Sequence, residues 1–162
     1  MDVQSAASIT MCLSKVTLAA GTTSTLSNTS TIVYAIRGKA LSASALSNTA
    51  TPTTDAATGA AFTGVVANYG SVFLVGLNAA GDLKCVQGSI TPLDVAGKFI
   101  VAPQFGGPPL DFCPIGYIVI KAGATANATT GWVFGTNNMA SVTGITYTFV
   151  DVVGMPDRPQ IS

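Results

Sequence analysis

The chain has 162 residues, which is enough for one domain that buries a sizeable core. Only 9% of its residues are charged, whereas about 25% is usual, and seven Lys and Arg balance seven Asp to a net charge of zero. Nucleic-acid binding needs clustered basic residues, and a membrane-spanning helix needs ~18 consecutive apolar residues. The sequence has neither pattern, so neither a nucleic acid nor a membrane is expected as partner.

The composition also predicts the fold class. Glu is absent and Lys is scarce, while Thr, Val, Ser, Gly and Asn are abundant. Thr and Val favour extended strands and Gly and Asn favour turns, so we expect an all-β fold. Because so few charges leave little repulsion between molecules, we expect the chain to work in an assembly that covers much of its surface.

Apolar runs predict eight strands within a single β domain that spans residues 1–162. Their ranges are 15–18, 32–39, 72–77, 83–88, 98–101, 115–120, 132–134 and 145–149. Residues 1–13 are expected to form an N-terminal arm. Residues 154–162 are expected to form an extended C-terminal tail, which Pro156 and Pro159 stiffen.

The clearest local signal is a hairpin. The runs 72–77 and 83–88 flank the five-residue turn Asn-Ala-Ala-Gly-Asp at 78–82, whose Asn and Gly favour a tight reversal. The runs 72–77 and 115–120 are apolar on both faces, which predicts central strands. The run 145–149 alternates apolar residues with Thr, which predicts one buried face and one polar face.

Long connections separate several of these strands. Residues 21–31 consist almost wholly of Gly, Thr, Ser and Asn and are predicted to form a loop. Residues 47–64 are rich in Ala and Thr, and we expect an ordered excursion because Phe62 and Val65 supply apolar anchors. Eight strands with long connections favour a jelly roll, or two-sheet β-sandwich, with long loops and extended terminal arms.

Catalysis is disfavoured by the residue types that the chain lacks. Without His and Glu, the commonest general bases and nucleophile activators are missing. Isolated Asp residues such as Asp82 and Asp94 are expected to cap turns. The spacing of Cys12, Cys85 and Cys113 fits no zinc site and predicts buried free thiols in a reducing compartment. The sequence therefore predicts no catalytic, metal or cofactor site, and a protein that is not an enzyme.

Six residues are candidates for contact with other proteins. They are Phe105, Leu110, Phe112, Arg158, Pro159 and Gln160. The first three lie in a Pro- and Gly-rich loop, where apolar side chains either fold back into the core or contact a partner. The last three lie in the tail, which is either frayed or a docking arm whose prolines lower the entropy lost on binding.

Three segments carry a resemblance to a known family. These are the hairpin 72–88, the segment Phe112-Cys113-Pro114-Ile115-Gly116-Tyr117-Ile118-Val119 and the ending Pro156-Asp157-Arg158-Pro159. Together they resemble head decoration (cement) proteins of tailed bacteriophages, such as those of short-tailed cyanophages, over roughly residues 32–160. The resemblance implies a jelly-roll subunit that forms a homotrimer. It also implies that the subunit binds the major capsid protein on the outside of the head, where capsomers meet. There it would stabilise the shell against the pressure of packaged DNA.

Two other functions stay open. A tail or fibre module of the β-sandwich type would have the same composition. A carbohydrate-binding module is the other alternative; such modules usually present exposed aromatic side chains with acidic or amide groups, and the only Trp of this chain is Trp132. The sequence from Met1 to Gln4 lacks the basic start of a signal peptide. We therefore expect assembly in the host cytoplasm and a final place on the virion head surface.

Overall fold

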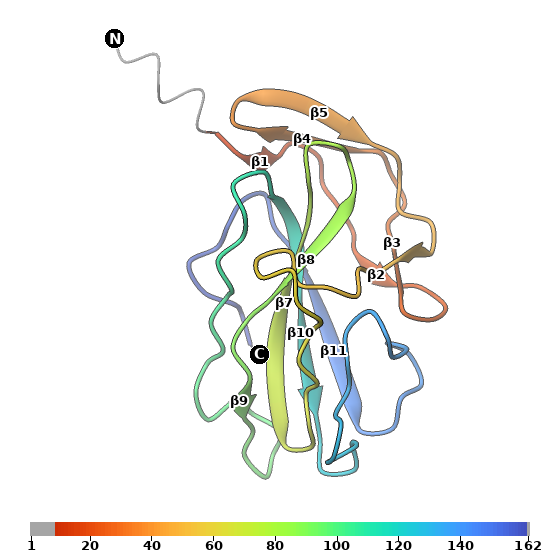
Figure 1. The fold of residues 1–162 in the computed structure, drawn as a ribbon, viewed down its shortest axis with the longest axis vertical. Helices are drawn as coiled ribbons and strands as arrows, with labels where there is room; N and C mark the ends of the chain where they lie inside the picture. The colour runs from red at the N-terminus through yellow and green to blue at the C-terminus, as the bar shows by residue number, and fades with distance from the viewer. Residues whose placement is uncertain (1–8, 162) are drawn as a thin grey trace.

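The computed structural model of the chain describes residues 9–161 and shows an all-β architecture, as predicted (Figure 1). No helix occurs in that range, and every strand pair is antiparallel. The strands are β1 (Met11–Cys12), β2 (Ala19–Ala20), β3 (Thr25–Ser27), β4 (Ile32–Ile36), β5 (Lys39–Ala43), β6 (Thr49–Ala50), β7 (Tyr69–Leu77), β8 (Leu83–Gln87), β9 (Thr91–Pro92), β10 (Cys113–Ala122) and β11 (Ile145–Asp151).

The main sheet has the strand order β11-β10-β7-β8, and the short β9 also pairs with β7. The predicted hairpin is confirmed, because β7 pairs with β8 from Phe73 opposite Gln87 to Leu77 opposite Leu83. Strands β7 and β10 lie at the centre and are almost entirely buried. Their runs of apolar residues on both faces therefore predicted their place correctly.

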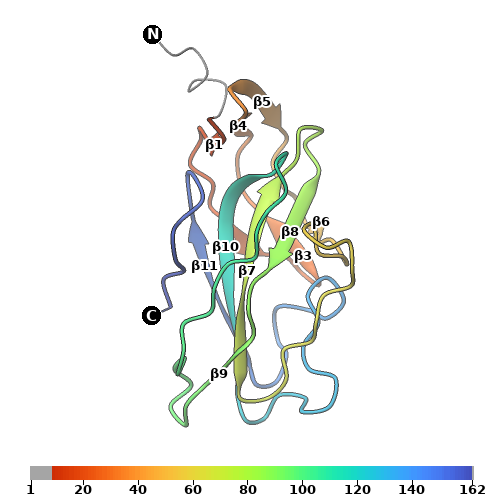
Figure 2. The ribbon, with the colours of Figure 1, turned by 60° about the vertical axis from the view of Figure 1, so that its left-hand side comes forward.

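The two faces of the main sheet are covered by different parts of the chain (Figures 1 and 2). On one face, Phe73, Val75 and Ile118 share a core with residues from β1, β3 and β4, which belong to two small sheets of order β1-β4-β5 and β2-β3-β6. On the other face, Leu74 and Tyr117 pack under the segment 88–112 and the C-terminal tail. Both faces of the main sheet are thus filled within one chain.

The predicted strand 32–39 is instead a hairpin of β4 and β5. Arg37 and Gly38 form its two-residue turn, with φ angles of 51° and 78°. Two consecutive positive φ angles are typical of a type I′ turn, which matches the twist of the flanking strands. The expected burial of one face is confirmed, because Ile32, Tyr34 and Ile36 are all buried.

Three other predicted strands are wrong. In 15–18, Val16 and Leu18 are buried as alternation suggests, but the Leu18 N–H donates to the Asp151 carboxylate and not to a strand. In 98–101, only Phe99 makes an isolated bridge. In 132–134, only Trp132 does so. None of the three segments pairs with a neighbouring strand over more than one residue. The predicted loop 21–31, in turn, contains the short β3.

The predicted excursion 47–64 is ordered and covers the free edge of β8. The buried Asp55 accepts hydrogen bonds from the N–H groups of Ala57 (2.7 Å) and Gln87 (3.1 Å), and Ala56 N–H donates to the Cys85 carbonyl. The expected anchors Phe62 and Val65 are buried. The outward Cys85 carbonyl and Gln87 N–H of β8 are therefore bonded within the chain, which hinders the pairing of this edge with another strand.

Candidate functional site

The Pro- and Gly-rich loop divides its predicted interface residues between core and surface. Phe112 is buried, and Phe105 is half-buried with its ring edge-on to Tyr117 at a centroid distance of 5.1 Å. Leu110 is 78% exposed. Phe105 and Phe112 thus fold back onto the core, which was the first of the two alternatives for this loop. Only Leu110 presents a free apolar side chain, and its contact with a partner stays a prediction.

The C-terminal tail lies against the main sheet. Gln160 N–H donates a 2.7 Å hydrogen bond to the Tyr117 hydroxyl, and Ile161 packs on the core beneath it. Pro159 is buried, whereas Arg158 and Gln160 remain exposed. Pro159 therefore anchors the tail to its own chain, and only the two exposed side chains are free to meet another protein. Of the expected N-terminal arm, residues 1–8 lie outside the described residues, and β1 pairs with β4.

Three of the exposed apolar side chains lie in residues 93–101, of which sequence reasoning assigned only 98–101 to a strand. In residues 93–101, Val95 is fully exposed, and Ile100 and Val101 are 62% and 61% exposed. We call this segment the 93–101 loop. One Asp94 carboxylate oxygen accepts 2.8 Å hydrogen bonds from the N–H groups of Ala96 and Lys98. The expected turn-capping role of Asp94 is thereby confirmed.

The 93–101 loop is held at both ends. Leu93 and Phe99 form a bridge across its base, and Asp94 N–H donates to the Lys98 carbonyl. The Lys121 ammonium lies over the Phe99 ring, 5.3 Å from its centroid. The sequence signal for this loop is the Asp-x-x-Gly turn at 94–97, which the apolar run 99–101 follows. Whether Ile100 and Val101 point inward or outward depends on tertiary packing, which the run alone does not encode.

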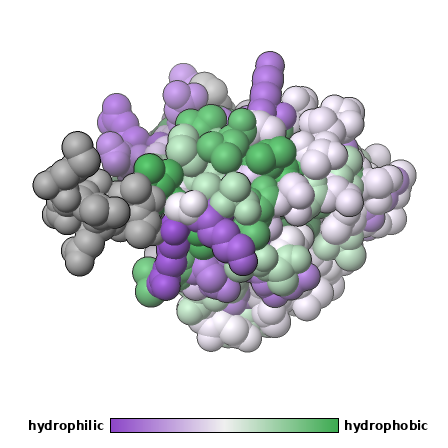
Figure 3. Space-filling view, turned by 90° about the horizontal axis from the view of Figure 1, so that it is seen from above, coloured by the Kyte–Doolittle hydropathy of each residue, from purple (hydrophilic) through white to green (hydrophobic). Residues whose placement is uncertain are grey.

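A second apolar surface lies at the end of the molecule near β1 and β4, where hydrophobic side chains gather in the end-on view of Figure 3. Leu13, Val33 and Val153 are 53%, 39% and 65% exposed there. Their backbones are joined, because Leu13 N–H donates to the Val33 carbonyl and Cys12 N–H donates to the Val153 carbonyl. A hollow of about 300 Å³ lies beside them, between residues 13–16 and 151–153. This end is therefore a further exposed apolar surface.

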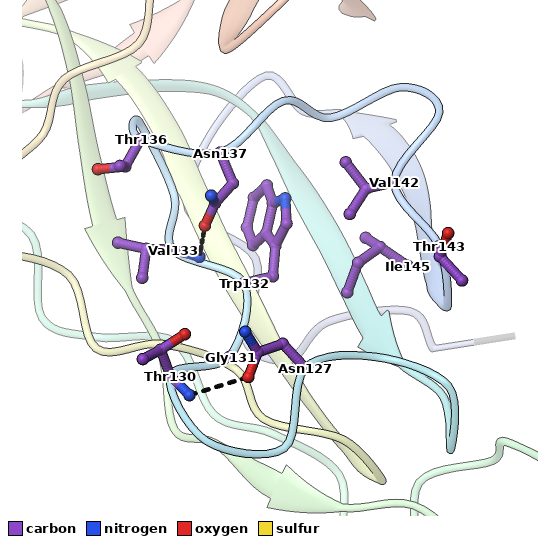
Figure 4. Close-up of a pocket in the computed structure, with 10 residues that line it drawn as sticks. All are labelled: Asn127, Thr130, Gly131, Trp132, Val133, Thr136, Asn137, Val142, Thr143 and Ile145. Carbon is purple, nitrogen blue, oxygen red and sulfur yellow. Dashed lines mark hydrogen bonds between the residues drawn. The ribbon is translucent and has the colours of Figure 1, made fainter.

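A pocket of about 380 Å³ adjoins Trp132 (Figure 4). Asn127 and Asn137 face it, and their side-chain oxygens accept hydrogen bonds from backbone N–H groups of the surrounding loop. Trp132 itself is only 3% exposed, and its indole N–H donates to the Asn138 carbonyl. The ring is therefore a core element rather than a platform for sugar stacking. The residues that line this pocket also carry no titratable group.

The turn 78–82 is closed by its own side chains. The Asn78 side-chain oxygen accepts hydrogen bonds from the N–H groups of Ala80 and Asp82, and its amide donates to the Asp82 carboxylate at 3.0 Å. Tyr34 hydroxyl donates to the Asn78 carbonyl from the neighbouring sheet. The Asn78 carbonyl, the Asn78 side-chain oxygen and one Asp82 carboxylate oxygen are thus engaged in hydrogen bonds of the turn. Among residues 9–161, no three His, Cys, Asp or Glu side chains gather as metal ligands.

All three cysteines are buried free thiols, as expected. Burial raises the pKa of the Cys113 thiol from 9.0 to about 12, and the nearby Cys12 adds to the effect. Burial also raises the pKa of Cys85 well above 9.0, with a smaller contribution from the Asp55 carboxylate. A thiol that stays protonated is a poor nucleophile, so Cys85 and Cys113 act as small core residues.

These raised values predict a loss of stability in alkali. In the unfolded chain the thiols ionise near pH 9, while in the fold Cys113 stays protonated until about pH 12. The contribution of Cys113 to stability is therefore constant below pH 9 and falls between pH 9 and 12, by up to about 1.4 kcal/mol per pH unit. Urea unfolding at pH 7.5, 9 and 10.5 measures this fall. Cys113→Ala should flatten it, and an unchanged slope in that variant would contradict the assignment.

No helix in the described part of the chain is long and apolar enough to span a membrane. Comparisons with models of protein families, with curated proteins and with solved structures gave no match for this chain.

Proposed function

We propose that this chain is a structural protein that decorates the outside of a bacteriophage head, where it binds between capsomers and stabilises the shell against the pressure of packaged DNA. The observation that carries the proposal is the 93–101 loop, which presents Val95, Ile100 and Val101 to solvent. Several exposed aliphatic side chains within one short segment are typical of a protein contact surface. The proposal includes a jelly-roll subunit, with the main sheet as one layer and the two small sheets as the other.

The rigidity of the loop supports binding. Because Asp94 and the bridge between Leu93 and Phe99 already fix its backbone, little conformational entropy is lost when a partner covers it. Burial of exposed aliphatic groups stabilises the contact by about 25 cal/mol per Å² of apolar surface. One loop gives a modest affinity, so several joined copies that bind together would supply the rest through avidity.

Binding to phage heads tests the proposal. The purified chain should bind expanded, DNA-filled heads and raise their resistance to heat, and it should not bind free capsid subunits. Ile100→Asp should weaken binding at least tenfold, because a carboxylate would be desolvated in the contact. Thr53→Asp places the same charge at another exposed position and should bind like the wild type. Heads of equal heat resistance with and without the protein would refute the stabilising role.

Copy number separates this function from that of a tail or fibre module. A decoration protein covers the head in hundreds of copies, whereas a tail module is present in a handful. Quantitative mass spectrometry of purified virions measures the ratio of this chain to the major capsid protein. A handful of copies per virion would contradict the decoration role and favour a tail or fibre module.

A further inference from the structure

Strand β11 forms an open edge of the main sheet (Figures 1 and 2). It is seven residues long, from Ile145 to Asp151, and pairs on one side with β10. The opposite edge strand, β8, is covered by the excursion around Asp55. The two edges of the sheet therefore differ, and β11 is the edge that another strand can reach.

The register identifies which backbone groups of β11 point outward. Val152 N–H donates to the Ile115 carbonyl, so in this antiparallel pair Thr146, Thr148 and Val150 also direct their hydrogen-bonding groups toward β10. Ile145, Tyr147, Phe149 and Asp151 must then direct theirs away from the sheet. No hydrogen bond among residues 9–161 engages the outward N–H of Tyr147 or Phe149.

Strand β11 also lacks the features that usually protect an open edge. Natural edge strands discourage pairing through Lys, Pro or a β-bulge. The register of β11 with β10 is continuous, so β11 has no bulge, and its sequence contains neither Lys nor Pro. Its one charge, at Asp151, lies at the end of the strand, where the carboxylate accepts a hydrogen bond from Leu18. An edge of this kind is built to be paired.

We propose that two copies of this chain associate edge to edge through β11, in an antiparallel pair with its two-fold axis at Thr148. This register is self-complementary. Tyr147, whose backbone N–H and C=O point away from β10, lies opposite Phe149 of the second copy, whose backbone groups point away from its own β10. Tyr147 and Phe149 are both partly buried on the face that packs on the larger core, so their rings extend that face across the junction. Thr148 is exposed and meets the same residue of the second copy, a favourable cross-strand pair.

Charge and edge geometry favour a second copy as the occupant. The net charge of zero means that identical chains do not repel one another. A head-to-tail pair between β11 and β8 is blocked, because the 47–64 excursion already bonds the β8 edge. The inference is independent of capsid binding. It favours a two-fold dimer over the homotrimer that the family resemblance implies.

Light scattering and amide hydrogen exchange on the full chain test whether two copies pair through β11. The wild type should form a dimer in which the N–H groups of Tyr147 and Phe149 exchange as slowly as those of Thr148 and Val150. Thr148→Lys places two like charges opposite each other at the axis and should give a folded monomer. In that monomer, the outward N–H groups of Tyr147 and Phe149 should lose protection, while those of Thr148 and Val150 should keep it. Thr53→Lys, an exposed substitution elsewhere, should remain dimeric.

Mixing variants provides a rescue. Thr148→Lys and Thr148→Asp should each be monomeric, and their mixture should form a heterodimer, because Lys and Asp then lie directly opposite. A wild-type monomer, whether or not its Tyr147 and Phe149 amides are protected, would overturn the proposal. An oligomer in which these amides exchange freely would also overturn it, as would a Thr148→Lys variant that stays dimeric.

Discussion

Phe73→Ala should lower the free energy of unfolding by about 3–5 kcal/mol, which in a domain of this size lowers the melting temperature by roughly 6–20 °C. Phe73 lies in central strand β7 and is fully buried. Its ring stacks on Phe134 at a centroid distance of 4.7 Å and meets Phe62 and Trp132 edge-on, at 5.8 and 6.0 Å. Removal of the ring leaves a cavity and breaks three aromatic contacts.

The single Trp provides the measurement. Trp132 is 3% exposed and borders Phe73, so its fluorescence should shift to longer wavelength on unfolding and report the transition in urea. Phe73→Leu keeps much of the volume and should cost less than Phe73→Ala. Leu110→Ala, at a 78% exposed position, is the matched surface control and should change stability by less than about 0.5 kcal/mol. Equal losses for Phe73→Ala and Leu110→Ala would contradict the placement of this core.

The central part of the fold could be predicted because its strands need no distant information. A run that is apolar on both faces, such as 115–120, fits only a strand with covered faces, and β10 is such a strand. The turn 78–82 carries its own closing side chains, Asn78 and Asp82, so local chemistry determines the hairpin. In both cases the residues that form the element also encode it.

Elsewhere, the tertiary context decides the conformation. Strands β2, β3 and β6 are two or three residues long and rich in Ala, Thr and Ser, so they have no alternation to detect. Arg37 adopts a positive φ that Asn or Gly adopts more readily, which hid the turn between β4 and β5. Val16 and Leu18 alternate like a strand, yet the Leu18 N–H donates to the Asp151 side chain and not to a neighbouring strand. These outcomes depend on neighbours far away in the sequence.

The candidate site shows the same limit. The sequence located the apolar side chains of the 88–112 segment but not which of them point outward. Phe112 fills the core because Gly76, against which its ring packs, has no side chain to exclude it. Ile100 and Val101 are exposed although the Ile100 N–H still donates to the Pro92 carbonyl, beyond the bridge between Leu93 and Phe99. The open edge of β11 was visible only once the register and the cover over β8 were known.

Gly76→Ala should destabilise the fold by about 1–3 kcal/mol, although it adds a single methyl group. A Cβ at position 76 would meet the Cys113 carbonyl of β10 and, at 2.5 Å, the ring of Phe112. The carbonyl belongs to the backbone of a paired central strand, so it cannot move without disturbing the ladder between β7 and β10. The cost is therefore steric rather than a loss of conformational freedom.

Gly107→Ala is the matched control for this substitution. No atom lies within 4 Å of a Cβ at Gly107, so the change should leave stability unchanged or raise it slightly by restricting the unfolded chain. Urea unfolding followed by Trp132 fluorescence compares the two variants. Because Gly76→Ala presses on Phe112, it should also loosen the 88–112 segment and speed amide exchange there. A Gly76→Ala variant as stable as Gly107→Ala would show that Phe112 does not pack against β7, and would place its side chain at the surface with Leu110.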